Sequence, residues 1–175
     1  PAEASLEPLS SPEDNVIHFI NGVYQPIDNM SFNDGIHCEN LSQNTALSSA
    51  LAAAVPDQHK VADFALAYAR DGLAITIDQP VAKPLQLIFD YSGDGVSSHP
   101  VLVFKIMPGA SLTILEEHKG EGSGLSAPLM LFCLEEGARL NHARRLIEAV
   151  SRYHLGLNLV KQQAKSVYHG DMVMA

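Results

Sequence analysis

The sequence of 175 residues has no tryptophan, only two cysteines and few charged residues, which make up 18% of the chain. Cys38 and Cys133 cannot build a disulfide framework and do not form a Cys-x-x-Cys pair. This usage fits a reducing compartment, so we expect a cytoplasmic protein. No apolar run approaches the ~20 residues of a membrane helix, and the N-terminus lacks the layout of a signal peptide. The sequence therefore predicts no membrane partner.

Basic residues are also scarce. The chain has 11 Lys and Arg against 20 Asp and Glu, a formal net charge of −9. Because phosphate binding relies on clustered Lys and Arg, we expect no nucleic-acid partner. Hydrophobic residues make up 46% of the chain. This content excludes a largely disordered protein and is sufficient for one core.

The first part of the chain divides into a lead-in and a small α/β region. Residues 1–15 are rich in Pro, Ser and acidic residues, and we expect them to be flexible. Residues 16–71 begin with VIHFINGVYQPI, which predicts two strands that turn at Asn21-Gly22, since both residues tolerate positive φ.

Two helices are predicted in the rest of this region, after a polar stretch at 36–44. The first is TALSSALAAAVP, stopped by Pro56. The second is KVADFALAYARDG, for which Asp71-Gly72 is the expected C-terminal cap.

Residues 72–175 have a different character. Short runs rich in β-branched and aromatic residues are bounded by Gly, Pro or Asp, which is typical of strands. The runs are LAITI, PLQLIF, PVLVFKI, ASLTIL and PLMLFCL.

A repeat underlies these runs. Residues 100–112 (PVLVFKIMPGASL) align without a gap with residues 128–140 (PLMLFCLEEGARL), at an offset of 28. Five of the thirteen aligned positions are identical. A third, degraded copy is expected from about Gly156, and an earlier, shortened copy from Pro84.

A period of this length indicates a solenoid, in which each unit buries its face against the next. Each unit would hold two strands joined by a corner, for which Gly109 and Gly137 supply the required backbone conformation. The first strand of each unit is apolar on both parities, which is typical of strands covered on two sides.

The segment EEGARLNHARRLIEAV (135–150) has strong local helix propensity. Leu140 nevertheless aligns with Leu112 in a segment that has no helical character. The repeat therefore predicts a strand from Ala138 onward, because propensity is a weak prior that tertiary context overrides. On such a strand the charged side chains are expected to face solvent or a partner, with Arg144 and Arg145 on opposite faces.

Six segments follow one another in a familiar order: FINGVYQP, ALAYARDGLAITI, KPLQLIF, PGASLTILEEH, EEGARLNHARRL and RYHLGLNLV. Together they resemble the SufD family, a subunit of the SufBCD complex that assembles iron–sulfur clusters. The resemblance runs from about residue 19 to about residue 167. The related SufB subunit shares the β-helical portion, and the early Asn-Gly strand pair and YARDGLAI favour SufD.

The resemblance implies a mainly β fold, namely a right-handed parallel β-helix preceded by a small α/β region. It implies a non-catalytic scaffold that pairs with SufB and the SufC ATPase. Family members continue through further coils, which carry the cluster-associated residues, into a helical segment that holds SufC. We therefore expect this chain to be a fragment with an incomplete β-helix and no bound cofactor, although its parent complex handles a cluster. No catalytic, cofactor-binding or metal-ligating residue is carried over.

An open β-helix end exposes unpaired strand edges. Dimerisation or disorder is therefore expected near residues 168–175, and a homodimer is a possible assembly.

Eight histidines, at positions 18, 37, 59, 99, 118, 142, 154 and 169, invite a metal hypothesis. The favoured interpretation is ordinary surface or hydrogen-bonding histidines. The alternative is a cupin-like metal-dependent enzyme or ligand-binding β-barrel. In it His118, His142 and His154 would converge with Glu116 or Glu117. Cupin motifs cluster two histidines tightly, so the spacing counts against it.

A carbohydrate-active β-helix would need clustered acids and exposed aromatics, and the chain has no Trp.

Three further features are interpreted as structural. Cys38 follows His37 in a polar loop, where an activated thiol is the less favoured alternative. Cys133 aligns with Lys105 and is expected to be less buried than its neighbours. The glycine-rich stretch 120–126 lacks the Gly-Lys-Ser/Thr of a phosphate loop and is expected to be a flexible connector.

Overall fold

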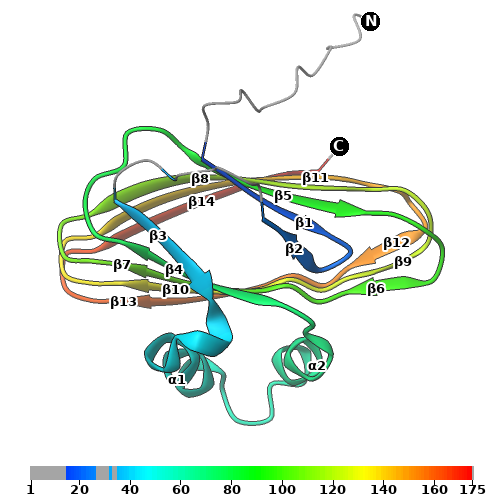
Figure 1. Ribbon diagram of the computed structural model, residues 1–175, viewed down its shortest axis with the longest axis horizontal. Coiled ribbons are helices and arrows are strands. Elements are labelled where there is room, and N and C mark those ends of the chain that lie inside the picture. The colour runs from blue at the N-terminus through cyan, green and yellow to red at the C-terminus, as the bar shows by residue number, and fades with distance from the viewer. Residues whose placement is uncertain (1–14, 27–31, 33–34, 175) are drawn as a thin grey trace, which may run out of the picture.

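Parallel strands that recur every 28 or 29 residues wind into a β-solenoid of about four turns from residue 72 onward (Figure 1). The computed structural model describes residues 15–26, 32 and 35–174. The mainly β fold with a preceding small α/β region is confirmed. The predicted lead-in lies outside the described residues except for Asn15, with which the first strand begins.

Three sheets line the coil. The first sheet lies at the top of Figure 1, in the order β14 (Val167–Met174), β11 (Arg139–Glu148), β8 (Ser111–Gly120), β5 (Leu85–Tyr91), β1 (Asn15–Ile20), β2 (Val23–Gln25). The second lies below it, in the order β13 (Leu157–Gln162), β10 (Leu129–Leu134), β7 (Val101–Ile106), β4 (Gly72–Ile77), β3 (Ile36–Asn40). The third forms one narrow side of the coil, at the right of Figure 1, in the order β12 (Arg152–His154), β9 (Gly124–Ser126), β6 (Val96–Ser98).

Residues that are 28 positions apart in the predicted repeat pair with one another on neighbouring strands. Leu129 pairs with Val101 and Leu157 with Leu129, so the offset of 28 and the third copy are confirmed. The prediction of an earlier copy from Pro84 is wrong. Residues 85–91 form β5, which pairs with β8, whereas the strand that precedes β7 in the second sheet is β4.

The segment 135–150 contains strand β11 and not a helix, as the repeat predicts. Its ten residues pair in register with all of β8, and it also pairs with β14. Two neighbouring strands satisfy its backbone groups, which outweighs the helix propensity of its Ala, Leu and Arg residues. β14 itself is a regular strand, so the alternative of disorder is wrong for residues 168–174.

The corners between the first and second sheets stack on one another. Gly109 and Gly137 have φ of 73° and 70°, and the amide of Gly109 donates to the carbonyl of Glu136 in the next coil. Lys165 occupies the equivalent position of the following coil with φ of 58°. Glycine is favoured in this left-handed conformation, whereas an L side chain is disfavoured. Because lysine replaces the corner glycine here, the third copy is harder to recognise in the sequence.

Two helices cover the outer face of the second sheet (Figure 1): α1 (Thr45–Ala54), preceded by the 3-10 turn η1 (Leu41–Gln43), and α2 (Lys60–Tyr68). Leu47 and Leu51 of α1 pack with Val103 and Leu131. This contact explains why β7 and β10 are apolar on both parities. α2 ends at Tyr68, so the cap predicted at Asp71-Gly72 is wrong.

Asp71 instead ties together the segments around the start of β4. Its carboxylate accepts hydrogen bonds from the amides of Tyr24 and Gly72 and from the Asn40 side chain. Neither described helix, of ten and nine residues, is long enough to cross a bilayer.

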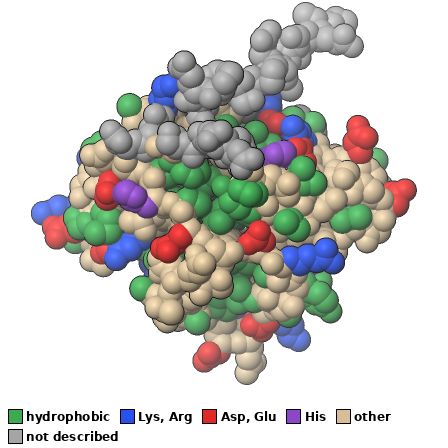
Figure 2. All heavy atoms as spheres, viewed as in Figure 1, with side chains coloured by type: hydrophobic (Ala, Val, Ile, Leu, Met, Phe, Trp, Pro, Cys, Tyr) green, Lys and Arg blue, Asp and Glu red, His purple; other side chains and the backbone are tan. Residues whose placement is uncertain are grey.

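The N-terminal region closes one end of the coil. The predicted hairpin is confirmed, with Asn21 and Gly22 at φ of 49° and 81° between β1 and β2. Phe19 stacks on Phe89 at 5.4 Å between ring centroids. The polar stretch at 36–44, for which no strand is predicted, contains β3, an antiparallel edge strand that buries Ile36. Figure 2 views this end, where hydrophobic side chains gather in the middle of the face.

Glycine substitutions test the corner and the coil packing separately. Gly137→Ala should lower the free energy of unfolding by about 1–2 kcal/mol, because it forces a left-handed residue into an open site. Gly124→Ala should cost more than about 3 kcal/mol. Its φ is 151° and an added Cβ would lie 2.0 Å from the Val96 carbonyl oxygen. Lys165→Gly should instead raise the free energy of unfolding, because glycine accepts the left-handed conformation at this corner. Urea denaturation measures all three, and equal losses for Gly124 and Gly137 would contradict the packing argument.

Candidate functional site: a polar cluster inside the coil

The interior of the solenoid changes from apolar to polar along its axis. Side chains of successive coils stack in rows, and one row contains Leu87, Glu116 and Arg144. In the second sheet the interior row passes from Met130 to Asn158. The coils near the capped end are therefore filled with hydrocarbon, whereas the later coils enclose titratable side chains.

Glu116 is at the centre of this polar interior and its side chain is fully buried. Its two carboxylate oxygens accept hydrogen bonds from Nε2 of His118 and Nε2 of His142, and Nε of Arg144 lies 3.0 Å from Oε1. Burial acts to raise the pKa of Glu116. The two histidine hydrogen bonds and the charges of His118 and Arg144 outweigh it, so the pKa lies well below its usual value. Glu116 is therefore a buried, ionised and fully paired carboxylate.

His118 is held on both ring nitrogens. With Nε2–H donating to Glu116, Nδ1 is left to accept from the Tyr91 hydroxyl at 2.8 Å. The imidazole stacks on Phe89 at 4.5 Å between centroids. Burial lowers the pKa of His118 and outweighs the hydrogen bond and charge of Glu116, which act to raise it.

A second carboxylate and histidine lie beside His118. The His154 ring meets the His118 ring edge-on at 4.7 Å, and His154 Nδ1 is 3.1 Å from Oε2 of Glu148. Burial acts to raise the pKa of Glu148, but hydrogen bonds from His154 and Ser126, with the charges of His154 and His118, hold it below its usual value. Oε1 of Glu148 and Nε2 of His154 are buried without a partner of good geometry.

Arg152 closes the end of the coil next to this pair. Its guanidinium lies 5.3 Å from the centre of the Tyr91 ring. It donates to the carbonyls of Gly93, Val96, Glu121 and Ser123. These carbonyls face the arginine where the third sheet turns, so its role is structural.

On the far side of Glu116 the cluster reaches a hollow of about 240 Å³. His142 Nδ1 is 3.2 Å from the Tyr168 hydroxyl, and Arg144, Asn158 and Gly170 also line the hollow. It lies on the side of the last described coil.

The structure brings together the three histidines that the metal hypothesis named. Glu116 joins them, but Glu117 does not: its carboxylate pairs with Arg145 outside the coil. The expected opposite orientation of Arg144 and Arg145 is confirmed. The expectation that charged residues of this strand face solvent is wrong for His142 and Arg144, which face inward. The cupin-like barrel is also wrong, because the strands form a coil of parallel sheets.

Sequence reasoning did not identify Tyr91, Glu148 and Arg152 as members of the cluster. A signal for Glu148 exists in the register, since it shares the inward parity of Leu140, His142 and Arg144 on β11. Tyr91 has the same kind of signal, since it shares the inward parity of Leu87 and Phe89 on β5, whereas Arg152 has none.

The other five histidines have ordinary roles, as favoured. His18, His37 and His169 each contact an aspartate, at positions 90, 78 and 171. His59 caps α2 by accepting from the amide of Ala62. His99 packs against the rings of Phe64 and Tyr68.

Neither cysteine is an activated thiol. Cys38 lies in β3 and not in a loop, and burial, with a smaller contribution from Glu39, raises its pKa to about 11. Cys133 is partly exposed between buried neighbours and pairs with Lys105, as predicted. The stretch 120–126 is not simply a connector, because Gly124–Ser126 forms β9.

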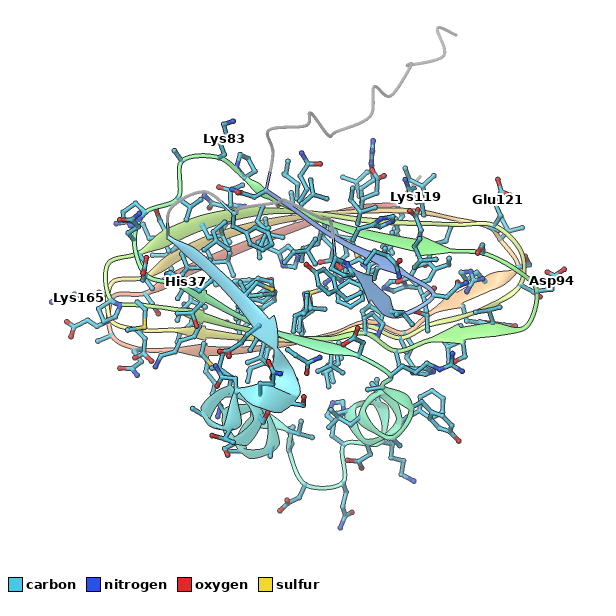
Figure 3. The ribbon with its side chains drawn as sticks, viewed as in Figure 1. His37, Lys83, Asp94, Lys119, Glu121 and Lys165 are labelled. Carbon is cyan, nitrogen blue, oxygen red and sulfur yellow. The ribbon has the colours of Figure 1, made fainter. Side chains whose placement is uncertain are left out.

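Charged side chains outside the coil are scattered. Figure 3 shows Lys83, Asp94, Lys119, Glu121 and Lys165 on the outer surface, and Figure 2 shows acidic and basic groups mixed around the rim of the visible face. Inside the coil, by contrast, Glu116 lies in contact with His118, His142 and Arg144.

Comparisons with known proteins give no family assignment. No protein-family model matches the chain, and no curated protein matches it.

Glu116→Gln should lower the free energy of unfolding by about 3 kcal/mol, because Arg144 then keeps a buried charge without its carboxylate. Glu117→Gln is the matched control on the same strand. It removes a carboxylate from the partly exposed Arg145 pair and should cost about 1 kcal/mol or less. Chemical denaturation at neutral pH measures both, and equal losses would contradict the central role of Glu116.

The same pair of proteins tests the charge of Glu116 by pH. A lowered folded-state pKa gives stability that is fully present above the unfolded pKa of about 4.3. It is lost as pH falls through the folded pKa. The difference between wild type and Glu116→Gln should thus stay constant from neutral pH to about 5 and shrink below about 4. A difference that disappears already at pH 6 would indicate a histidine as the source.

Proposed function

We propose that the protein is a non-catalytic scaffold subunit of the SufD type. It supports cytoplasmic iron–sulfur cluster assembly and pairs with SufB-like and SufC-like subunits. The proposal rests on the ordered sequence resemblance and on the β-solenoid with a preceding small α/β region, which is the fold that the resemblance implies. The cluster is cargo of the complex in this proposal.

The observation that carries a docking role is the edge of the last coil. β12, β13 and β14 are each the terminal strand of their sheet among the described residues. Met172, Val173 and Met174 of β14 are 57%, 62% and 74% exposed, whereas Leu146, which pairs with Met174, is 7% exposed. Strands with free backbone groups and exposed apolar side chains add further strands from the same chain or from a partner.

The contrast with the other end supports this interpretation. At the N-terminal end, the β1–β2 hairpin and β3 cover the interior with Phe19, Tyr24 and Ile36. Solenoids protect an end with such a cap when it is not used for stacking. Among the described residues, β12, β13 and β14 have no comparable cover.

The first test is co-purification. We expect the complete natural protein that carries this sequence to retain SufB-like and SufC-like subunits from the same source when all three are co-expressed under reducing conditions. The tagged protein is captured and the retained subunits are quantified by mass spectrometry. An unrelated tagged β-solenoid serves as the control for strand-edge stickiness. Absence of both subunits, or equal retention by the control, would contradict the proposal.

The second test concerns the exposed edge in the 175-residue chain. We propose that this chain self-associates through β14, giving a concentration-dependent homodimer in analytical ultracentrifugation. Val173→Lys places a charge on the edge and should raise the dissociation constant at least ~10-fold, equal to about 1.4 kcal/mol. Val150→Lys, at a fully exposed turn position, is the matched control and should have no effect. A monomer at all concentrations would refute self-association. It would not bear on the co-purification test, which concerns other subunits.

A further inference from the structure

A set of three potential metal ligands lies inside the coil. A nitrogen of His118, an oxygen of Glu148 and a nitrogen of His154 all lie within 4.8 Å of one another. They come from β8, the end of β11 and β12, so coil stacking holds them on three different strands. We propose that these three residues form a binding site for a divalent first-row transition-metal ion, of which Zn²⁺ is the representative.

The ligand chemistry supports an ion of this class. Two imidazole nitrogens and one carboxylate oxygen form a known protein donor set for Zn²⁺, with bonds of about 2.0–2.2 Å. Tetrahedral ligands at that distance lie about 3.4 Å apart. The 3.1 Å between His154 Nδ1 and Glu148 Oε2 is already that close. The other ligand atoms have to approach by at most about 1.4 Å, which rotation of the partly exposed His154 side chain can supply.

A surrounding shell of hydrogen bonds orients the first ligand. Metal-bound histidines almost always donate their other ring N–H to a carboxylate, which fixes the tautomer. His118 does this with Glu116 through Nε2. Nδ1 is the nitrogen that remains for the ion, which would replace its present hydrogen bond with the Tyr91 hydroxyl at 2.8 Å. The Tyr91 hydroxyl or a water completes the coordination.

Unsatisfied atoms supply an independent observation. Oε1 of Glu148, whose side chain is only 7% exposed, has no hydrogen-bond partner of good geometry, because the Ser126 hydroxyl that lowers the pKa of Glu148 does not reach such geometry. Buried polar atoms are nearly always paired. An ion held by Glu148, or a water on that ion, provides the missing partner. The site does not depend on the proposed scaffold function, and it would stand if co-purification failed.

The test is calorimetric titration of the chelator-treated 175-residue chain with Zn²⁺, with Co²⁺ absorption as a report of coordination. We expect one ion per chain and visible d–d bands of a low-coordinate Co²⁺ site. Glu148→Gln and His154→Gln should each weaken Zn²⁺ binding at least 10-fold. His169→Gln is the matched control, since His169 contacts Asp171 in an exposed pair away from the cluster, and it should bind as wild type does.

Protection from chemical modification gives a measurement that needs no variant. Zn²⁺ should protect His154 from carbethoxylation, as mapped by mass spectrometry, and leave His169 unchanged. The proposal is overturned by absent one-to-one binding, by wild-type affinity in both site variants, or by equal modification of His154 with and without Zn²⁺. If Glu148→Gln does not fold, the protection result on the wild-type chain decides alone.

Discussion

In-register pairing of parallel strands, one coil apart, is the constraint on which the rest of this structure depends. Val101, Leu129 and Leu157 lie side by side, and so do Ser111, Arg139 and Val167. Side chains alternate between the two faces with a period of two. Once the register is set, each residue of a strand is therefore assigned to the interior or to the outside. A slip by one residue would place Phe104 and Phe132 outside the coil and Lys105 within it.

The same constraint makes the polar cluster possible. Glu116, His118, His142 and Arg144 all have inward parity, so the register delivers four titratable side chains to one enclosed space. Burying a charge is costly unless it is paired and hydrogen-bonded. Glu116 meets that condition through two histidines and one arginine. Loss of any one partner would leave a buried charge or polar group unpaired and destabilise the fold. The stability of the coils that supply these residues is therefore linked.

The repeat made the strands and corners of the coil predictable, but it did not predict which side chains contact one another inside the coil. Phe104 aligns with Phe132 and Gly109 with Gly137, so the strands, the corner and the strand nature of 135–150 followed from spacing alone. The same alignment puts His142 opposite Ile114, a buried position, and so contains evidence that His142 faces inward.

Other features were not accessible from one sequence. β3 is an edge strand with a single buried residue, Ile36, so its local pattern is weak. For Glu148 the register indicates only that the side chain faces inward, because its partner Gly120 carries no side chain to suggest a contact. Contacts such as His118 with His154 join residues 36 positions apart on different sheets. They depend on rotamers and on how the coil closes at the third sheet.

The polar cluster lies close to the uncovered edge of the coil, and its position determines which chemical groups a covering coil or partner needs. In the row that contains Ile114 and His142, the last coil has Gly170, whose missing side chain leaves His142 and Arg144 beside the hollow. Asn158 replaces the hydrocarbon of Met130 in the facing sheet. A purely apolar layer packed here would strand these polar groups and incur their desolvation cost. A covering coil or partner therefore has to combine apolar contacts along β14 with hydrogen-bonding groups above Arg144 and Asn158. The specificity of this end then lies in its polar interior more than in its exposed methionines.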